Sequence, residues 1–322
     1  MASGLDWMPF MGRLRLLIAG MLLILAAGHE RPAAAQELSA TFRSSVDLVR
    51  LAAVVRDRRG RFIPSLSARD FEVLDEGKPR PIEDFRHDAA GLSVALLFDI
   101  SGSMEGSLAS AREAASHVLS WLTAEHDESA VFTFDTQLDE VVPLTARLKV
   151  LPDSMTALVP FGATSLHDAI ARTAERLATR GSRRRAIVVL TDGHDTASRL
   201  SPAEVSAIAS AIDVPVYIVG VVAPIDNPSA GESTKDGRSS LTGSLNELAS
   251  WTGGTVFVTS SPVQRAAAAR RIVEELRQQY LIVFESSGTP GWHPLVVRVR
   301  DKDLVVRARS GYYAGQSRPN SD

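Results

Sequence analysis

A short stretch, Asp99-Ile-Ser-Gly-Ser103, carries the side chains of this chain that are best suited to chemistry. It presents one carboxylate and two hydroxyls, which are hard oxygen donors that suit Mg²⁺, Ca²⁺ or Mn²⁺ better than softer metals. Because the hydroxyls are neutral, a cation held here would keep much of its charge, and a carboxylate from outside could complete its shell. Taken alone, the pentapeptide fits a Ser/Gly turn equally well, with Asp99 only capping a helix.

The residues before Asp99 predict the element that positions it. The run from Leu92 to Phe98 is nearly all apolar, which favours a central strand of a parallel sheet that is covered on both faces. Ligands of open α/β sheets bind outside the carboxyl ends of the strands. We therefore expect Asp99 to end a buried strand and to face a ligand site.

Two further motifs follow the first in the chain. Phe161-Gly-Ala-Thr164 lies ahead of a helix-like pattern, and Ala186-Ile-Val-Val-Leu-Thr-Asp192 is a second apolar run that ends in an aspartate. Together with Asp99-Ile-Ser-Gly-Ser103 they resemble the von Willebrand factor A-type (VWFA) domain, whose Asp-x-Ser-x-Ser sequence begins a metal-ion-dependent adhesion site (MIDAS). In that family a threonine and a second aspartate far downstream complete the site.

The resemblance assigns a role to each matching residue. It implies that Ser101, Ser103 and Thr164 bind Mg²⁺, or else Mn²⁺ or Ca²⁺, directly. It also implies that Asp99 and Asp192 act directly or through water molecules. The expected metal site therefore consists of five oxygen-bearing side chains from three loops.

The flanks resemble a group of exported bacterial VWFA relatives that is rich in acidobacteria. The similar stretches are Val54-Val-Arg-Asp57, the run from Leu66 to Leu74, Asp75-Glu-Gly-Lys78 and Gly311-Tyr-Tyr313. With the metal motifs, the resemblance spans about residues 44–313. The metal motifs are much more specific than either flank.

Strand-like and helix-like runs alternate between the flanks, which predicts an α/β fold with a doubly wound, mostly parallel sheet flanked by helices. Leu138 to Val142 predicts an antiparallel edge strand. Ser165-Leu-His-Asp168 has the form of a capping box at a helix start. The mixed charges of the last helix, from Pro262 to Gln279, predict a solvated face.

The N- and C-terminal segments are expected to pair into one small antiparallel β unit, because each alone is small for independent stability. The predicted organisation is a signal peptide (1–35), an N-terminal β segment (36–88), a VWFA domain (89–279), a C-terminal β segment that packs with 44–88 (280–313) and a disordered tail (314–322). The Ser/Gly/Pro-rich stretch 223–243 predicts a long loop that is either functional or disordered.

Residues 11–35 have the pattern of a secretory signal, with Arg13 and Arg15 before an apolar core and Ala33-Ala-Ala35 as the cleavage site. Asp6 and Trp7 are unusual in a signal, so translation starts at either Met1 or Met11. An uncleaved anchor is the alternative to cleavage. We expect a periplasmic or extracellular protein without a membrane span once the signal has been removed.

Composition restricts the functional classes. The chain has 322 residues, no cysteine and a formal net charge of -3, which excludes disulfides and thiolate sites and does not favour nucleic acid as a partner. The chain lacks the glycine-flanked serine of hydrolases, the paired histidines of zinc enzymes and a phosphate-binding loop.

We therefore expect no enzyme, but a protein-binding module for adhesion or scaffolding whose cation captures an Asp or Glu of a protein partner. Two alternatives stay open. A metal-assisted hydrolase could use Asp99 and Asp192 to activate water. A structural envelope component would hold no exchangeable metal.

Overall fold

The computed structural model describes residues 47–87, 91–178, 184–211, 213–224 and 243–314. The expected signal peptide, most of the 223–243 stretch and nearly all of the C-terminal tail lie outside these residues. None of the described helices is both long and apolar enough to cross a membrane.

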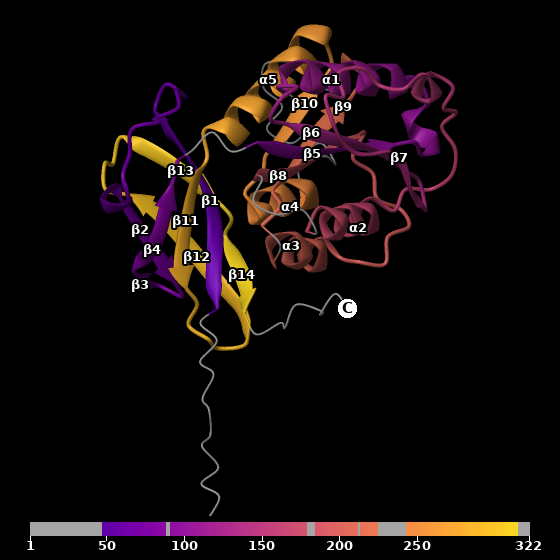
Figure 1. The fold of residues 1–322 in the computed structure, drawn as a ribbon. Helices are drawn as coiled ribbons and strands as arrows, with labels where there is room; N and C mark the ends of the chain where they lie inside the picture. Colours follow the sequence, from indigo (N-terminus) through magenta and orange to yellow (C-terminus); the bar gives the residue numbers. More distant parts are fainter. Residues whose placement is uncertain (1–46, 88–90, 179–183, 212, 225–242, 315–322) are drawn as a thin grey trace, which may run out of the picture. The chain divides into compact units, whose positions relative to one another are not determined.

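The main sheet has six strands in the order β10-β9-β8-β5-β6-β7 (Figure 1). All neighbours are parallel except β6 and β7, so the expected antiparallel edge strand is confirmed. The strands are β5 (Leu92–Asp99), β6 (Glu128–Phe134), β7 (Leu138–Ala146), β8 (Arg184–Thr191), β9 (Val216–Val221) and β10 (Val256–Thr259).

Helices cover both faces of this sheet, as a doubly wound fold requires. The helices are α1 (Leu108–Trp121), α2 (Leu166–Ala178), α3 (Pro202–Ala211), α4 (Ser244–Thr252) and α5 (Pro262–Arg277). Alternate residues of β5 point to opposite faces. Figure 1 shows α1 and α5 on one side of the sheet and α2, α3 and α4 on the other. Leu96 and Phe98 lie in a core cluster with α1 and α5, whereas Ala95 and Leu97 lie in a second cluster with α2, α3 and α4. Both faces of β5 are therefore buried, as its apolar run predicts.

The two flanks together form one β unit, so the expected pairing of N- and C-terminal strands is confirmed. Its two four-stranded sheets have the orders β13-β1-β11-β4 and β14-β12-β2-β3. The strands from the N-terminal side are β1 (Leu48–Asp57), β2 (Phe71–Asp75), β3 (Lys78–Arg80) and β4 (Ile82–Arg86), and those from the C-terminal side are β11 (Tyr280–Glu285), β12 (Gly291–Val299), β13 (Leu304–Ala308) and β14 (Gly311–Ala314). Short 3-10 turns span Ala68–Asp70, Gly102–Gly106 and Asp153–Thr156.

The core of the β unit needs both flanks. Leu51 of β1 and Phe71 of β2 share a buried cluster with Tyr280 and Ile282 of β11 and Leu295 of β12. Each sheet alone would expose this apolar face to water. Strands that are more than 200 residues apart in the sequence therefore form one core.

The charged residues of α5 are not simply a solvated face, so that part of the sequence interpretation was wrong. Glu275 is completely buried and forms ion pairs with Arg56 of β1 and Arg307 of β13. Arg265 is 6% exposed, and its guanidinium lies 2.6 Å from Glu113 of α1. The pattern failed here because the partners of these charges come from distant parts of the chain.

A buried carboxylate fixes the end of the main sheet that lies opposite the metal motifs. Asp127, just before β6, accepts hydrogen bonds from the backbone N–H groups of Leu92 (3.0 Å) and Thr123 (2.6 Å) and from Arg277 Nη2 (2.7 Å). Although burial raises the pKa of Asp127, these hydrogen bonds lower it more, so the pKa lies below its ordinary value of 3.8. Asp127 thereby connects β5 to the ends of α1 and α5.

We predict that Asp127→Asn lowers the free energy of unfolding by about 2 kcal/mol at neutral pH, because charge-assisted hydrogen bonds are lost. The folded-state pKa is depressed, so the contribution of Asp127 is present above pH 3.8 and is lost as the pH falls through the folded-state pKa. Urea unfolding at several pH values measures this, with Asp84→Asn, a half-exposed surface aspartate, as the control. A constant difference down to pH 2 would contradict the assignment.

Candidate metal centre

Asp99 ends β5 and is completely buried. Its Oδ1 accepts the N–H of Ser101 at 2.9 Å, and its Oδ2 accepts the hydroxyl of Thr191, the last residue of β8, at 2.6 Å. The carboxylate is therefore held between two neighbouring parallel strands. Its orientation is fixed before any ligand binds.

This position is the topological switch point of the sheet. From β5 the chain continues to β6 and β7 on one side, and it later returns through β8, β9 and β10 on the other side. The loops that leave β5 and β8 therefore diverge, and the carboxyl edge between them is open to a ligand. Asp99 is the last residue of β5 and Asp192 directly follows β8, so the structure brings both aspartates to the switch point.

Ser101 and Ser103 lie on the loop between β5 and α1. Their hydroxyl oxygens are 3.2 Å apart. Ser101 is 1% exposed, whereas Ser103 is exposed. The hydroxyls of Ser101 and Ser103 therefore form two adjacent oxygen donors between the buried Asp99 carboxylate and the protein surface.

The Thr164 loop is attached to this serine loop through the backbone. The N–H of Gly102 donates to the carbonyl of Gly162 (3.1 Å), and the N–H of Phe161 donates to the carbonyl of Ile100 (2.9 Å). Gly162 has a φ of +83°, in the left-handed region that favours glycine. These contacts place Thr164 next to the serine loop.

Thr164 is fixed by its backbone. Its N–H donates to the hydroxyl of Thr196 (3.0 Å), and its carbonyl accepts the N–H groups of Thr196 and Ala197, both at 2.9 Å. None of these hydrogen bonds involves the Thr164 hydroxyl, and Thr164 is 2% exposed. They also attach the Thr164 loop to the loop that carries Asp192.

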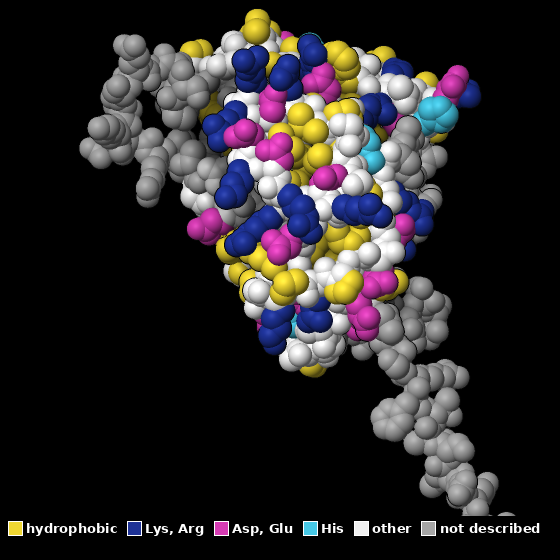
Figure 2. Space-filling model, turned by 90° about the vertical axis from the view of Figure 1, so that its left-hand side faces the viewer, with side chains coloured by type: hydrophobic (Ala, Val, Ile, Leu, Met, Phe, Trp, Pro, Cys, Tyr) yellow, Lys and Arg dark blue, Asp and Glu magenta, His cyan; other side chains and the backbone are white. Residues whose placement is uncertain are grey.

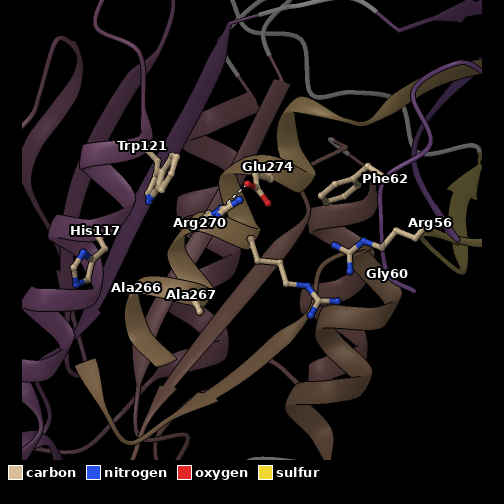
Figure 3. Close-up of a pocket in the computed structure, with 10 residues that line it drawn as sticks. Arg56, Gly60, Phe62, His117, Trp121, Ala266, Ala267, Arg270 and Glu274 are labelled. Atoms are coloured by element: carbon tan, nitrogen blue, oxygen red, sulfur yellow. Dashed lines mark hydrogen bonds and ion pairs between the residues drawn. The ribbon is translucent and has the colours of Figure 1, made fainter. Parts of the chain in front are cut away.

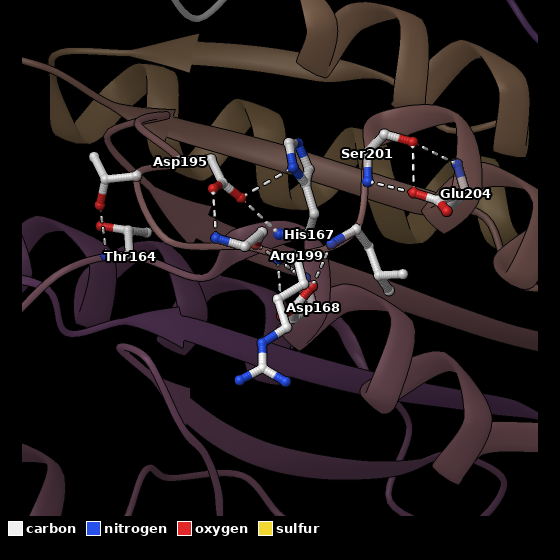
Figure 4. A network of polar contacts seen from close by, with 10 residues as sticks. Thr164, His167, Asp168, Asp195, Arg199, Ser201 and Glu204 are labelled. Carbon is white, nitrogen blue, oxygen red and sulfur yellow. Dashed lines mark hydrogen bonds and ion pairs between the residues drawn. The ribbon is translucent and has the colours of Figure 1, made fainter.

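A second set of contacts holds these two loops together (Figure 4). Asp195 Oδ2 accepts the N–H of His167 and lies 3.0 Å from His167 Nδ1, while Asp195 Oδ1 accepts the N–H of Ser198. Asp168 accepts the N–H groups of Arg199 (3.1 Å) and Leu200 (2.9 Å). Each carboxylate thus binds backbone donors of the other loop or of its own turn.

Helix α2 does begin after Ser165, but the expected capping box is not formed. The N–H of Ser165 donates to the carbonyl of Asp135 (2.7 Å), and Asp168 accepts donors from the loop after β8. The helix start is instead capped from outside, by Asp195 and by the Ser198 hydroxyl, which accepts the N–H of Asp168 (3.2 Å). A local pattern could not show this, because the partners are about 30 residues away.

Asp192 directly follows β8, and 14% of its side chain is exposed. Its Oδ1 lies 3.4 Å from both the backbone N–H and Nδ1 of His194, which are long contacts. Asp192 is close enough to Asp99 for the charges of the two carboxylates to interact. No strong protein partner neutralises Asp192 among the residues that the structure describes.

The electrostatics of the site fit a cation. Burial raises the pKa of Asp99 against the lowering effect of the hydrogen bonds from Ser101 and Thr191, and the charge of Asp192 raises it further. An ionised Asp99 is therefore costly in the protein alone, and a bound cation would offset that cost.

The donor chemistry also fits. Every candidate side chain offers oxygen, and oxygen ligands suit Mg²⁺, Mn²⁺ and Ca²⁺. The described residues contain no group of three or more His, Asp or Glu side chains that could hold a metal ion. The candidate site has two carboxylates, so hydroxyl groups would have to supply its other protein ligands. The residues that would hold the cation are Asp99, Ser101, Ser103, Thr164 and Asp192.

Sequence reasoning missed the residues that support this site. Thr191 orients Asp99, whereas Asp195 and Asp168 hold the two downstream loops together. The sequence offers one indication of a role for Asp195, which is that it lies three residues after Asp192 in the stretch Thr191-Asp-Gly-His-Asp195. Apart from Ser198, which is close to Asp195 in sequence, their partners lie 28 to 92 positions away, and only the fold shows such pairings.

Comparison with known proteins gives one family. A family model described as von Willebrand factor type A domain matches residues 93–269. No curated protein matches the chain.

Several solved structures are similar in fold. An aerotolerance-related membrane protein from Bacteroides fragilis is 21% identical with a TM-score of 0.47, and the match covers 58% of this chain and 100% of that chain. A von Willebrand factor type A protein from Catenulispora acidiphila is 14% identical with a TM-score of 0.46, over 84% and 76% of the two chains. A proximal thread matrix protein from the mussel byssus, with a zinc-occupied MIDAS motif, is 19% identical with a TM-score of 0.45, over 63% and 50%.

We predict that the protein without residues 1–35 takes up one Mg²⁺ or Mn²⁺ in isothermal titration calorimetry. Asp99→Ala should abolish this uptake, because the buried carboxylate is the central acceptor of the site. Ser103→Ala should weaken it, because one neutral donor is lost. At a metal concentration of 100 times Kd, the wild type should gain about 2.7 kcal/mol of stability. Asp84→Asn is the control, and equal uptake by wild type and Asp99→Ala would refute the metal site.

Proposed function

The chain belongs to the von Willebrand factor type A domain family, and we propose that it is an exported module that binds a protein partner through a divalent cation. Domains of this family are often metal-dependent protein-interaction modules. The observation that carries the proposal is the fixed Asp99 carboxylate at the switch point, beside the adjacent hydroxyls of Ser101 and Ser103.

A bound Mg²⁺, or else Mn²⁺ or Ca²⁺, would supply a Lewis-acidic centre that accepts a carboxylate oxygen of the partner. The chain contributes the fixed geometry and the neutral donors. Because Ser101, Ser103 and Thr164 carry no charge, they do not cancel the attraction for an incoming Asp or Glu. Asp99 and Asp192 supply the negative charge that retains the cation.

Exposed apolar side chains next to the site support a protein partner. Val159 and Phe161 are both 79% exposed. The backbone of Phe161 is fixed to the serine loop by its hydrogen bond to Ile100 (2.9 Å). Large apolar side chains that are held at the surface beside a polar site are typical of interaction surfaces. The proposed partner therefore presents an acidic residue with apolar neighbours.

We propose binding rather than catalysis. The site has two carboxylates and three hydroxyls, and the hydrogen bonds of Asp99 orient its carboxylate instead of activating a nucleophile. The apolar rim of Val159 and Phe161 suits a protein surface better than a phosphoester. The two alternatives to this binding function are a metal-assisted hydrolase and a structural envelope component that holds no exchangeable metal.

We also propose that residues 11–35 direct export, so that the protein works in the periplasm or outside the cell. The absence of cysteine does not distinguish an exported protein from one that stays inside the cell. The proposal of export therefore rests on the signal-like residues 11–35.

Selection of a random-peptide phage library on the immobilised protein in Mg²⁺, followed by elution with EDTA, tests the binding function. We expect the eluted peptides to share an Asp or Glu next to apolar residues. A synthetic peptide of that sequence should bind about tenfold more weakly, or not at all, after Glu→Gln or in EDTA, since the carboxylate contact is lost. Asp99→Ala should not bind it.

Three results would contradict the proposal. Binding that is indifferent to EDTA would favour the structural alternative. Mg²⁺-dependent turnover of p-nitrophenyl phosphate that Asp99→Ala abolishes would favour the hydrolase. A peptide whose affinity survives Glu→Gln would remove the carboxylate from the mechanism.

The same peptide tests the apolar rim. Val159→Ser and Phe161→Ser should each weaken peptide binding severalfold and leave Mg²⁺ affinity unchanged, because neither side chain is a metal donor. Val263→Ser on α5 is a matched control, since Val263 is also 79% exposed. Equal peptide affinity in all three variants would exclude the rim from the contact.

Export has its own readout. Expression of the full chain in a Gram-negative host should give a periplasmic protein whose intact mass corresponds to a start near Gln36, because cleavage after Ala33-Ala-Ala35 removes the leader. Substituting Leu23 and Leu25 by Arg should keep the protein inside the cell. A membrane-bound product of full length would support the uncleaved anchor instead.

A further inference from the structure

A groove lies away from the metal centre, where α1 and α5 meet the turn after β1 (Figure 3). Its volume is about 590 Å³. His117 and Trp121 of α1 lie on one side, Phe62 and Arg56 lie on the other, and Arg270 with Glu274 lies between them. Helix α1 begins beside the serine loop and is 14 residues long, about 21 Å. Because Trp121 is its last residue, the groove is remote from the metal centre.

The groove has an excess of positive charge. Three arginines (56, 270 and 271) and one acidic residue, Glu274, line it. The whole chain has a formal net charge of -3, so this surplus is local. Figure 2 shows the molecule from the side of the β unit, where Lys and Arg side chains are spread among hydrophobic and acidic ones.

The arginines are only partly neutralised by their protein partners. The buried carboxylate of Glu275 pairs with Arg56 and Arg307, and Arg271 Nε lies 3.6 Å from it. One carboxylate therefore serves three guanidinium groups. Arg56 Nε and Arg307 Nε are buried without a hydrogen-bond partner among the described residues. An anion near Arg271, whose side chain is 55% exposed, would balance this cluster.

Aromatic rings hold the guanidinium groups in place. The Arg56 guanidinium lies 4.5 Å from the centre of the Phe62 ring, and that of Arg270 lies 5.6 Å from Trp121. At these distances the rings attract the guanidinium charge, and the N–H groups can still bind carboxylates. Arg270 also pairs with Glu274 at 2.6 Å, so its charge is shared.

The groove also offers apolar surface. Trp121 is 45% exposed, although it is a large ring. Ala266 and Ala267 line the groove with methyl groups only, which leaves space beside the ring. Exposed Trp and Arg are the residue types that contribute most to protein interfaces.

We propose that this groove binds an acidic peptide segment of a partner protein, with carboxylates at Arg271 and Arg270 and an aromatic or aliphatic side chain against Trp121. Charge complementarity selects the occupant, since a basic or neutral segment would leave the arginine surplus unbalanced. Each carboxylate accepts guanidinium N–H groups, which Arg can donate in a bidentate manner. The contact needs no metal and is independent of the proposed function of the metal centre.

The probe is a fluorescein-labelled peptide of alternating Glu and Leu residues with one central Phe, measured by fluorescence anisotropy in EDTA. We expect saturable binding that weakens with added salt and that disappears when every Glu is replaced by Gln. Arg271→Gln and Trp121→Ala should each weaken it about tenfold. The matched controls Arg298→Gln and Trp292→Ala, on exposed positions of β12, should not change it. Asp99→Ala should bind as the wild type does, which separates this site from the metal centre.

Four outcomes would overturn the proposal. Unchanged affinity in Arg271→Gln and Trp121→Ala would place the peptide elsewhere. Equal binding of the Gln peptide would show that only apolar contact matters. Competition by inorganic phosphate at concentrations near the peptide Kd would indicate a small-anion site. Binding of phosphatidylglycerol vesicles without binding of the peptide would assign the groove to a lipid surface.

Discussion

The carboxylate of Asp99, completely buried at the end of the central strand, is the constraint on which the rest of the site depends. Removing a charge from water is costly, and the raised pKa of Asp99 reflects that cost. Because the folded-state pKa is raised, ionised Asp99 reduces stability as the pH rises through that value. The hydrogen bonds from Ser101 and Thr191 offset only part of this cost, and a cation bound beside Asp99 would offset more of it.

Several carboxylates lie near Asp99 at the carboxyl edge of the main sheet, and most of them accept hydrogen bonds from backbone N–H groups. Asp195 and Asp168 are occupied by backbone N–H groups and by His167, which fixes the loops on either side of α2. Asp135 likewise accepts the N–H of Gln137 (2.7 Å). These carboxylates are therefore structural. Among the described carboxylates at this edge, Asp192 has only long contacts, both at 3.4 Å to His194, so it could join Asp99 at a ligand.

The main features could be predicted from local patterns. The apolar run before Asp99 predicted a strand that is buried on both faces, which the structure confirms. The motif that follows lies at the switch point, and the role of its side chains as metal donors stays a prediction. The sequence also predicted one antiparallel β unit from the two flanks, which the structure confirms. The turn at Glu76 and Gly77, with φ of 51° and 79°, forms the tight hairpin between β2 and β3. In each case the signal lies within a few residues.

What could not be predicted depends on pairings across the chain. Helix α5 carries both signs of charge in sequence, which is typical of a solvated face. In the structure, Glu275 pairs with Arg56 and Arg307, which are 219 and 32 positions away in the sequence. Arg265 pairs with Glu113, which is 152 positions away. Likewise, Asp168 has the residue type and spacing of a capping box, but its carboxylate accepts the backbone N–H groups of Arg199 and Leu200 in the loop after β8. A charge pattern in the sequence indicates the type of group that a side chain can bind. The fold determines which partner residue lies within contact distance.

The buried pairs of Glu275 also bear on how the chain is divided. Residues 46–322 form one compact unit, although the family model matches only 93–269. Helix α5 ends at Arg277 and β11 begins at Tyr280, so a short connection joins the last helix of the α/β part to the β unit. The ion pairs of Glu275 then attach the buried face of α5 to β1 and β13. Removing one partner of a buried ion pair is much more damaging than replacing the whole set, because a charge is left without compensation. The β unit is therefore attached to α5 through buried ion pairs, in addition to the apolar contacts that α5 makes with the main sheet.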